Sequence, residues 1–383
     1  MSLDDDAKAE LARLEAAHLL RVPRVLDGMQ GPIVTVDGIE ACSFASNDYL
    51  GLAGDARLVR AAAASLDEDG AGAGASRLII GNHRQHVVLE AAVADWTRRD
   101  GVRLFNTGYA ANVGVLATLA RAGDVVFSDE LNHASIIDGC RLSRAEVVVY
   151  PHRDLAALER ALGKTRGARR LVISESLFSM DGDLADVAAL AALCKQHDAG
   201  LILDEAHAMG ALGVEGRGVA ADAGVVPDVV IGTFGKALGS FGAFAASSRA
   251  VAELLWNRAR TLVFSTGLPP SVAAATTAAI EIVRGAEGEQ RRRTLASHAR
   301  RFRELVPHAG GAAESAIAPV RIDDDQRVMR LTARLLEDRV FVQGIRPPTV
   351  PAGTARLRVS LSARHERTDV EKAARLIAAA TTR

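Results

Sequence analysis

Lys236 lies in a glycine-rich segment that follows a short apolar run. The run is VVI at residues 229–231, and the segment is GTFGKALG at residues 232–239. A lone lysine after a strand is usually solvated, so the argument depends on its neighbours. Glycines let the backbone approach a ligand closely, and Thr233 places a hydroxyl beside the amine. An amine desolvated in such a crevice has a lowered pKa, as Schiff-base chemistry requires, which makes Lys236 a candidate nucleophile.

Asp204 ends a second apolar run and opens the tetrapeptide DEAH. The run is LIL at residues 201–203, and His207 closes the tetrapeptide. A carboxylate at the end of a buried strand is costly unless it meets a cation or a metal. The protonated nitrogen of a pyridine ring is such a cation, and His207 could reach the phenolic oxygen of the same ring. This pattern favours a bound pyridine cofactor over an ordinary surface carboxylate.

Gly108 and Tyr109 open a helical run that continues to Leu119, within the segment NTGYAAN at residues 106–112. Free backbone N–H groups at the N-terminus of a helix form a phosphate site. Every helix has such an end, so this signal is weak by itself.

These residues are positioned by an alternation of short apolar runs and helical stretches. The β-branched runs are residues 125–127, 147–150, 171–173, 201–203 and 229–231. Alternation of this kind predicts a mainly parallel sheet wrapped by helices, the α/β class. Ligands of open α/β sheets collect at the carboxyl ends of the strands. We therefore expect one crevice to receive the polar residues that follow the runs: His133, Ser179, Asp204, Thr233 and Lys236.

The chain divides into three expected parts. Residues 1–45 form an N-terminal arm, with an amphipathic helix within residues 4–21 and a hairpin at residues 33–44 that turns at Asp37 and Gly38. Residues 46–285 form the large α/β domain. Residues 286–383 form a smaller C-terminal α+β domain, since 383 residues exceed what a single growing core holds.

Composition argues against several classes of function. Lys plus Arg number 46 against 47 Asp plus Glu, so no net field favours nucleic acid. No apolar run approaches the roughly 18 residues of a membrane span, and the acidic N-terminus lacks the core of a secretory signal, so we expect a cytoplasmic protein. Three widely spaced cysteines suggest neither disulfides nor a metal site. His83 and His86 share a helical face without a further ligand nearby, so no metal is expected.

Six motifs together resemble the α-oxoamine synthases, a family of fold-type I pyridoxal 5′-phosphate enzymes. The resemblance runs in order from about residue 40 to Ser362. The motifs are SNDYLG at 46–51, GASR at 74–77, NHAS at 132–135, SLFSMDG at 176–182, DEAH at 204–207 and GKA at 235–237.

The resemblance implies a role for each candidate. Lys236 would form the Schiff base with the cofactor, and Asp204 would pair with its ring nitrogen. His207 and Ser179 would contact the phenolic edge and His133 would stack on the ring. Thr233 with the amides of Gly108 and Tyr109 would hold the phosphate. Arg358 would bind the amino-acid carboxylate, and Arg21 and Thr349 would line the acyl-substrate side. By residue pattern alone, Arg356 and Arg358 alternate with apolar residues as on a half-exposed strand.

Two further segments indicate the substrates through the same resemblance. DGCRLSR at 138–144 and RPPTVPAGTARLR at 346–358 are most similar to members that condense L-alanine with a pimeloyl thioester, carried by coenzyme A or acyl carrier protein. Glycine C-acetyltransferase, 5-aminolevulinate synthase and serine palmitoyltransferase remain alternatives, and an aminotransferase is a more distant one. The family also implies a homodimer, since the loop at residues 265–267 resembles one that reaches the neighbouring subunit's phosphate.

Three readings from other classes are weaker. DEAH also occurs in helicases, but no GxxxxGK(S/T) loop accompanies it: Val230 stands at the first glycine position and Ala237 at the Ser/Thr position. GAGAGA at residues 70–75 fits a loose dinucleotide fingerprint, yet SLDED precedes it rather than a strand. A catalytically inactive relative would be expected to lack Lys236 or Asp204, and both are present.

Overall fold

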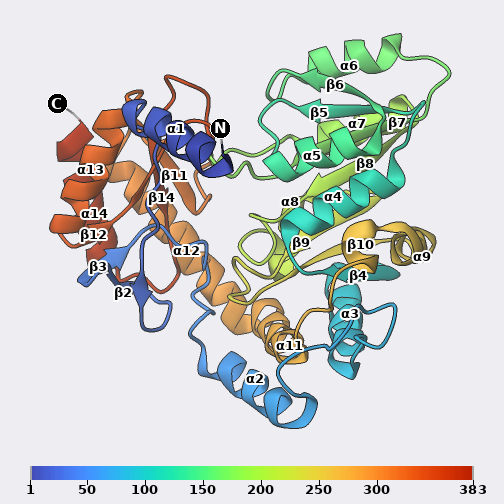
Figure 1. Cartoon of the computed structure of the whole chain (residues 1–383), viewed down its shortest axis with the longest axis horizontal. Coiled ribbons are helices and arrows are strands. Elements are labelled where there is room, and N and C mark those ends of the chain that lie inside the picture. Colours follow the sequence, from blue (N-terminus) through green and yellow to red (C-terminus); the bar gives the residue numbers. More distant parts are fainter. Residues whose placement is uncertain (1, 382–383) are drawn as a thin grey trace. The chain divides into compact units, whose positions relative to one another are not determined.

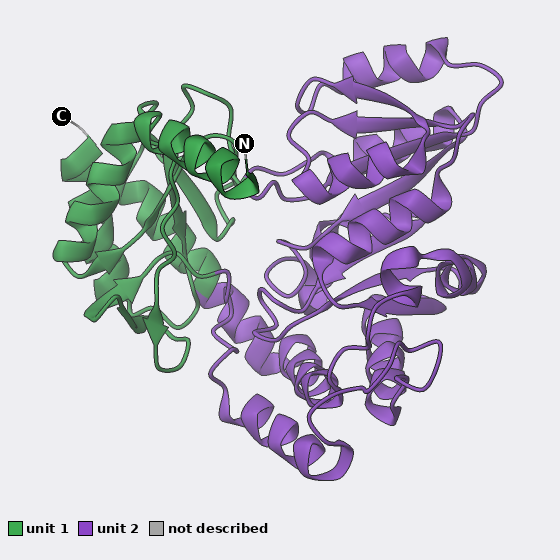
Figure 2. Cartoon of the chain, in the orientation of Figure 1, with its two compact units in different colours: residues 1–46, 180–182, 295–383 green, residues 47–179, 183–294 purple. Residues whose placement is uncertain are grey.

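The structure is a computed structural model that describes residues 2–381. Its contacts divide the chain into two compact units, coloured separately in Figure 2. The larger unit comprises residues 47–179 and 183–294. The smaller unit comprises the described residues up to Ser46, residues 180–182, and those from Leu295 onward.

The larger unit is built on a seven-stranded sheet in the order β4-β10-β9-β8-β7-β5-β6 (Figure 1). Pairings from β6 through β5, β7 and β8 to β9 are parallel, and β10 runs antiparallel to both β9 and β4. This confirms the α/β class. The strands are β4 (Gly101–Phe105), β5 (Val125–Asp129), β6 (Glu146–Tyr150), β7 (Arg170–Glu175), β8 (Ala199–Asp204), β9 (Val229–Thr233) and β10 (Ala243–Ser247).

The order of the strands reverses at β5. The chain leaves β5 to form β6 on one side and returns to form β7 on the other. The crevice at the carboxyl ends of the strands on either side of such a reversal is the usual place for a ligand in this class of sheet. His133 follows β5 and Ser179 follows β7, so both belong to the loops that flank this point.

Helices cover both faces of the sheet because strand residues alternate between two cores. Phe127 and Leu203 belong to the core under α6 and α7, whereas the adjacent Val126 and Ile202 belong to the core under α4 and α5. Both faces are therefore apolar, as a parallel sheet requires. Figure 1 shows α4 and α5 lying across the strands. The helices are α2 (Ala56–Asp69), α3 (Arg84–Thr97), α4 (Gly108–Leu119), α5 (Ala134–Ser143), α6 (Leu155–Lys164), α7 (Val187–Gln196), α8 (Gly218–Asp222), α9 (Arg249–Arg258), α10 (Arg260–Val263) and α11 (Pro270–Arg284).

The smaller unit contains two short sheets, in the orders β1-β2-β3-β12 and β11-β14-β13. Strand β3 pairs in parallel with β12, with Cys42 opposite Val340. This pairing explains why the N-terminal residues cluster with the C-terminal ones. The elements are α1 (Leu3–Ala16), β1 (Leu26–Asp27), β2 (Ile33–Val36), β3 (Ile39–Ser43), β11 (Ile317–Arg321), α13 (Asp325–Glu337), β12 (Val340–Phe341), β13 (Gln343–Ile345), β14 (Arg356–Ser360) and α14 (Arg367–Thr381), and α12 (Ala286–Leu305) continues from one unit into the other.

The N-terminal segment follows its local sequence signals. The hairpin of β2 and β3 is present, and both turn residues, Asp37 and Gly38, have the positive φ that a two-residue turn favours. Helix α1 begins at a capping box formed by Ser2 and Asp5. It ends at Ala16, earlier than its apolar pattern suggested, and none of its residues is buried. No helix within residues 2–381 is both long and apolar enough to cross a membrane.

Candidate active site

All eight residues expected at the cofactor lie in the larger unit. Asp204 and Thr233 are the last residues of β8 and β9, and His133 is the N-cap of α5. Ser179 and Lys236 lie in the loops after β7 and β9, and His207 follows β8. Gly108 and Tyr109 are the first two residues of α4. The carboxyl ends of the strands therefore carry most of the predicted set.

Asp204 is a buried carboxylate with a hydrogen-bond donor on each oxygen. Its Oδ2 accepts a hydrogen bond of 2.7 Å from Asn112 Nδ2, and its Oδ1 accepts one of 2.8 Å from the backbone N–H of Ala206. The side chain is only 5% exposed. Both donors are neutral, so they orient the carboxylate without cancelling its charge. Asp204 is thus suited to face a cationic ring nitrogen.

Asn112 is a site residue that sequence reasoning did not select. It lies on α4 among buried apolar residues, and its amide donates to Ser135 Oγ (2.9 Å) as well as to Asp204. Its Oδ1 is buried without a hydrogen-bond partner in the part of the chain that the structure describes. A polar side chain inside an apolar helical run, four residues after Gly108, was the available signal.

His133 lies close to two charged groups of the site. Burial among its neighbours and the nearby Lys236 amine lower the pKa of the His133 imidazole, whereas the Asp204 carboxylate opposes that shift. Its Nδ1 lies 2.7 Å from Ser135 Oγ and accepts a hydrogen bond from the Ser135 amide. The ring is therefore neutral and fixed in orientation, which suits stacking on an aromatic cofactor. His133, Asp204 and Lys236 are brought together as expected from the positions of their strands.

His207 is oriented by a tyrosine from a distant segment. The Tyr49 hydroxyl lies 2.7 Å from His207 Nδ1, and Tyr49 is fully buried. Tyr49 belongs to the SNDYLG motif, but no role had been predicted for it. The contact brings that motif to the end of β8 and leaves Nε2 of His207 as the nitrogen directed away from Tyr49.

Thr233 lies next to the N-terminus of α4. A Cβ built on Gly108 would lie 4.0 Å from the Thr233 Cβ, an ordinary contact distance, so the first residue of α4 is a direct neighbour of Thr233. Thr233 Oγ1 donates to the Gly242 carbonyl (3.0 Å) and accepts from the Gly235 amide (3.2 Å). A helix N-terminus beside a fixed hydroxyl is a suitable phosphate site.

The loop that carries Ser179 is fastened to its neighbours by a histidine. His152 bridges Asp129 and Asp183, with both N–O distances at 2.9 Å, and its ring packs edge-on against Phe178. These two carboxylates raise the pKa of His152 to about 9 despite its partial burial, which opposes the shift. At neutral pH the imidazolium therefore pairs with both acids and holds the Ser179 loop in place.

Arg358 lies in the smaller unit and is buried. It is 6% exposed on β14, and its Nη1 donates to Ser360 Oγ at 2.7 Å. Arg356 is 3% exposed and pairs with Asp181. The alternation with apolar residues therefore does not reflect a half-exposed strand. A buried guanidinium is typical of a site that receives a carboxylate.

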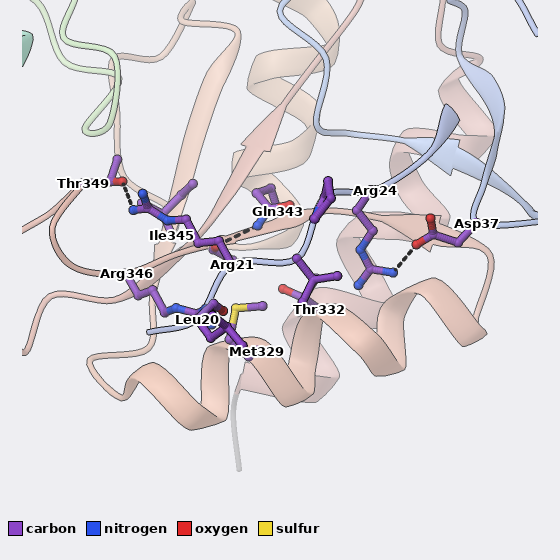
Figure 3. A pocket seen from close by; sticks show the side chains of 13 residues that line it. Leu20, Arg21, Arg24, Asp37, Met329, Thr332, Gln343, Ile345, Arg346 and Thr349 are labelled. Atoms are coloured by element: carbon purple, nitrogen blue, oxygen red, sulfur yellow. Dashed lines mark hydrogen bonds and ion pairs between the residues drawn. The ribbon is translucent and has the colours of Figure 1, made fainter. Parts of the chain in front are cut away.

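Arg21 and Thr349 line a pocket of about 530 Å³ within the smaller unit, drawn in Figure 3. Arg21 Nη2 donates to Thr349 Oγ1 at 3.0 Å. Arg346 reaches into the same wall and donates to the Leu20 carbonyl at 2.6 Å, while its Nε is buried without a partner among residues 2–381. The pocket thus combines guanidinium groups with the apolar side chains of Met329 and other residues.

The paired histidines of α3 have local structural partners. His86 Nδ1 accepts from the His83 amide at 3.0 Å, and its Nε2 lies 2.6 Å from the Leu268 carbonyl. Within residues 2–381 no group of three or more His, Cys, Asp and Glu side chains is arranged to hold a metal ion. Cys42, Cys140 and Cys194 are buried free thiols.

The residues present fit pyridoxal phosphate. Asp204 offers a buried anion with neutral hydrogen-bond donors, and the start of α4 with Thr233 offers a phosphate site. The Lys236 amine and the Asp204 carboxylate both interact electrostatically with His133, so the three side chains belong to one site. A family model for class I and II aminotransferases matches residues 40–377. The fold and the match together define the class: a fold-type I, pyridoxal phosphate-dependent enzyme.

Comparison with known proteins narrows the class. The chain is 49% identical over 370 residues to an 8-amino-7-oxononanoate synthase of Geobacter sulfurreducens, covering 95% of each chain. It is 47% identical over 374 residues to one of Pelobacter propionicus, covering 96% of each. The chain therefore belongs to the 8-amino-7-oxononanoate synthase family, which is a family of acyltransferases.

Solved structures show the same fold. The serine palmitoyltransferase of Sphingomonas wittichii aligns with a TM-score of 0.92 at 34% identity, covering 99% of this chain and 98% of that one. An 8-amino-7-oxononanoate synthase from Francisella tularensis aligns with a TM-score of 0.75 at 27% identity, covering 88% and 97% respectively. Backbone similarity is thus shared across sister activities.

Proposed function

We propose that this protein condenses L-alanine with a pimeloyl thioester, with loss of carbon dioxide. The products are 8-amino-7-oxononanoate and the free thiol of the carrier, a step of biotin biosynthesis. The observation that carries the proposal is 49% identity over 95% of both chains to a relative of that name. The buried, unpaired thiols are consistent with action in the cytoplasm.

Each residue in the larger unit has a distinct task in this proposal. Pyridoxal phosphate, when bound, supplies an electron-accepting ring for the pair released from the amino-acid α-carbon. Lys236 would hold the cofactor covalently and would serve as the base for the α-proton of the amino acid. Asp204 would keep the ring nitrogen protonated, and His133 would cover one face of the ring. Gly108, Tyr109 and Thr233 would hold the phosphate, and Ser179 and His207 would contact the phenolic edge.

Arg358 and the pocket of the smaller unit are assigned to the substrates. The buried Arg358 guanidinium would hold the carboxylate of alanine. The pocket lined by Arg21 and Thr349 would take part of the acyl substrate, since it offers guanidinium groups beside apolar side chains. Pimelate has a carboxylate at the end of an apolar chain, which matches this combination. The carrier is either coenzyme A or acyl carrier protein.

Substrate preference tests the proposal directly. We expect a higher kcat/KM for alanine than for glycine or serine with a pimeloyl donor, and for pimeloyl than for acetyl or succinyl donors with alanine. One methyl group discriminates by only about 1–3 kcal/mol, so slow reaction of glycine is expected. Competition among mixed amino acids and thioesters, scored by product mass, measures the preference. Aminoacetone-type or aminolevulinate products in excess would assign the chain to a sister activity.

Serine palmitoyltransferase is the second candidate, because structures of that enzyme align with a TM-score of 0.92. Their sequence identity of 32–34% is lower than the 45–49% to the 8-amino-7-oxononanoate synthases. Backbone shape is shared by many activities, whereas side chains decide specificity. Serine and a palmitoyl thioester are included in the same competition assay. If their condensation product is the main product, serine palmitoyltransferase is the favoured activity.

We also propose that the enzyme is a homodimer. Large apolar side chains are exposed at Ile79 (76%), Ile80 (78%) and Phe264 (72%). Their segments lie together, since Ser76 forms a β-bridge with Thr266. Exposed apolar groups of this kind are typical of a protein interface. The loop at residues 265–267 is the one expected to reach a neighbouring subunit.

Ile80→Asp is expected to shift the protein toward monomers, because a carboxylate would be buried in the interface. Activity is expected to fall as the fraction of monomer rises. Val226→Asp is the matched control, since Val226 is equally exposed at 78% on another segment. Sedimentation velocity at assay concentration gives the oligomeric state. A wild-type protein that is fully active as a monomer would contradict the proposal.

A further inference from the structure

Glu175 and Asp204 end neighbouring strands of the central sheet. Strands β7 and β8 are parallel, and Glu175 is the register partner of Asp204. Adjacent strands lie about 4.8 Å apart, and register partners point to the same face. Both side chains are buried, at 2% and 5% exposure. Two carboxyl groups therefore share one dry region of the site.

The two carboxyl groups differ in the hydrogen bonds that they accept. Each oxygen of Asp204 accepts a bond, at 2.7 and 2.8 Å, from Asn112 and from the Ala206 amide. Glu175 accepts on Oε2 from the Ser179 amide at 3.3 Å. Within residues 2–381 its Oε1 has no partner at hydrogen-bond geometry, although the backbone N–H of His133 is near enough to favour the charged form. Donors stabilise the charged form of a carboxyl group. The negative charge of the pair is therefore better placed on Asp204.

The surrounding charges lead to the same conclusion. Burial and the Asp204 carboxylate raise the pKa of Glu175 to about 8, while Lys236 and the backbone N–H groups of His133 and Ser179 act in the opposite direction. These groups come from β8, from the loop after β9, from the start of α5 and from the loop after β7. Two like charges this close in a buried site do not both ionise readily, as in other carboxyl pairs.

We propose that Glu175 is held as a neutral carboxylic acid, so that the Glu175–Asp204 pair carries one negative charge. Glu175 is thus a positioning residue. Because Glu175 keeps its proton, Asp204 is the only anion of the pair, and it matches the single cation of the cofactor ring. Its Oε2 also fixes the amide of Ser179 in the loop at the phenolic edge. The inference rests on the proposed cofactor site for its functional meaning, but the protonation state belongs to the protein without cofactor.

Glu205 provides an internal comparison. It is also fully buried, and burial raises the pKa of Glu205 to about 7. Both of its oxygens accept backbone bonds, from Val219 at 2.9 Å and Ala220 at 2.8 Å. These bonds anchor the start of α8, which gives Glu205 a structural role. The two buried glutamates therefore differ in surroundings and can be distinguished one by one.

Infrared spectra of the cofactor-free protein test the proposal. At about pH 6 both buried glutamic acids should give a carbonyl band, and the Glu175 band is the one that is lost in Glu175→Gln and retained in Glu205→Gln. In wild type the Glu175 band should fade as pH rises through about 8, whereas the Glu205 band should fade earlier, through about 7. A wild-type spectrum with no protonated-acid band assignable to Glu175 overturns the proposal. Because neither cofactor nor substrate is present, this result is independent of the enzyme's reaction.

Thermal stability of the same cofactor-free proteins gives a second measurement. Between the ordinary glutamate pKa of 4.5 and about 8, the folded protein binds a proton that the unfolded chain releases. The Glu175 contribution to stability therefore declines as pH rises through this window, and a glutamine does not titrate. The melting temperature of Glu175→Gln relative to wild type should rise from about pH 6 to about pH 9. A difference that is constant with pH overturns the proposal even if the infrared band is weak.

The loaded enzyme supplies a third readout. Ionisation of Glu175 above about pH 8 would place a second anion beside the ring, so the absorbance of bound cofactor should show a transition there in wild type. That transition should be lost in Glu175→Gln. Identical titrations of the two proteins would contradict a role for Glu175 toward the cofactor. Failure of the substrate competition with these results intact would reject only the assigned reaction.

Discussion

Lys236→Ala is expected to abolish the visible absorbance of covalently bound cofactor and to lower turnover by roughly 10⁴-fold or more, since attachment and proton transfer are lost together. The reason lies in the position of the amine, in the loop after β9 and within electrostatic range of His133 and Glu175. Absorbance spectra and rates of product formation from alanine and a pimeloyl thioester provide the measurement.

Lys195→Ala is the matched control for this experiment. Lys195 is an exposed lysine in the last turn of α7, so its loss should change neither spectrum nor rate. Circular dichroism and melting temperature should show that both variants fold. Near-normal turnover in Lys236→Ala would mean that another group attaches the cofactor or removes the proton, and the assignment of the site would be wrong.

Asp204→Asn is expected to slow removal of the alanine α-proton by about 10²-fold or more, because the charge that keeps the ring nitrogen protonated is lost. The substitution keeps the shape of the side chain. Asn112 and the Ala206 amide donate to different oxygens of Asp204, so the single oxygen of asparagine accepts from one of them and its NH2 group faces the other. Exchange of the α-proton for deuterium, followed by proton magnetic resonance without acyl donor, isolates this step from condensation.

Cofactor affinity is measured alongside exchange, so that weak binding is not mistaken for slow chemistry. Asp222→Asn is the control, since Asp222 is exposed at the end of α8. Exchange at the wild-type rate in cofactor-saturated Asp204→Asn would remove the electron-sink role from Asp204. If Asp204→Asn binds the cofactor more weakly but exchanges the α-proton at the wild-type rate once saturated with cofactor, Asp204 contributes only to cofactor affinity.

Strand positions and their terminal residues were predictable because the signal is local. The runs at residues 125–127 and 201–203 became β5 and β8, each slightly longer than its apolar stretch. Asp204 therefore fell at a strand end as expected. The end of α1 was less predictable, because the left-handed backbone at His18 interrupts a pattern that periodicity alone would extend.

Several partners at the site could not be predicted, because they come from distant segments. Tyr49 meets His207 across 158 positions in sequence, and Asn112 meets Asp204 across 92. Asn112 stands out as a polar side chain in an apolar helical run, but nothing in the local sequence of either residue specifies its partner. Glu175 was overlooked for a related reason: its register opposite Asp204 depends on which strands become neighbours.

The sequence by itself determined the class of fold, the order of the elements and the identity of the groups able to do chemistry. Apolar periodicity and the residues at the ends of the runs are local properties, and they place Lys236, Asp204 and Thr233 at the edge of a parallel sheet. Tertiary structure alone decided how those groups are charged and oriented. Burial and neighbouring charges determine which of two adjacent carboxyl groups keeps its proton, and both arise only when β7 packs beside β8.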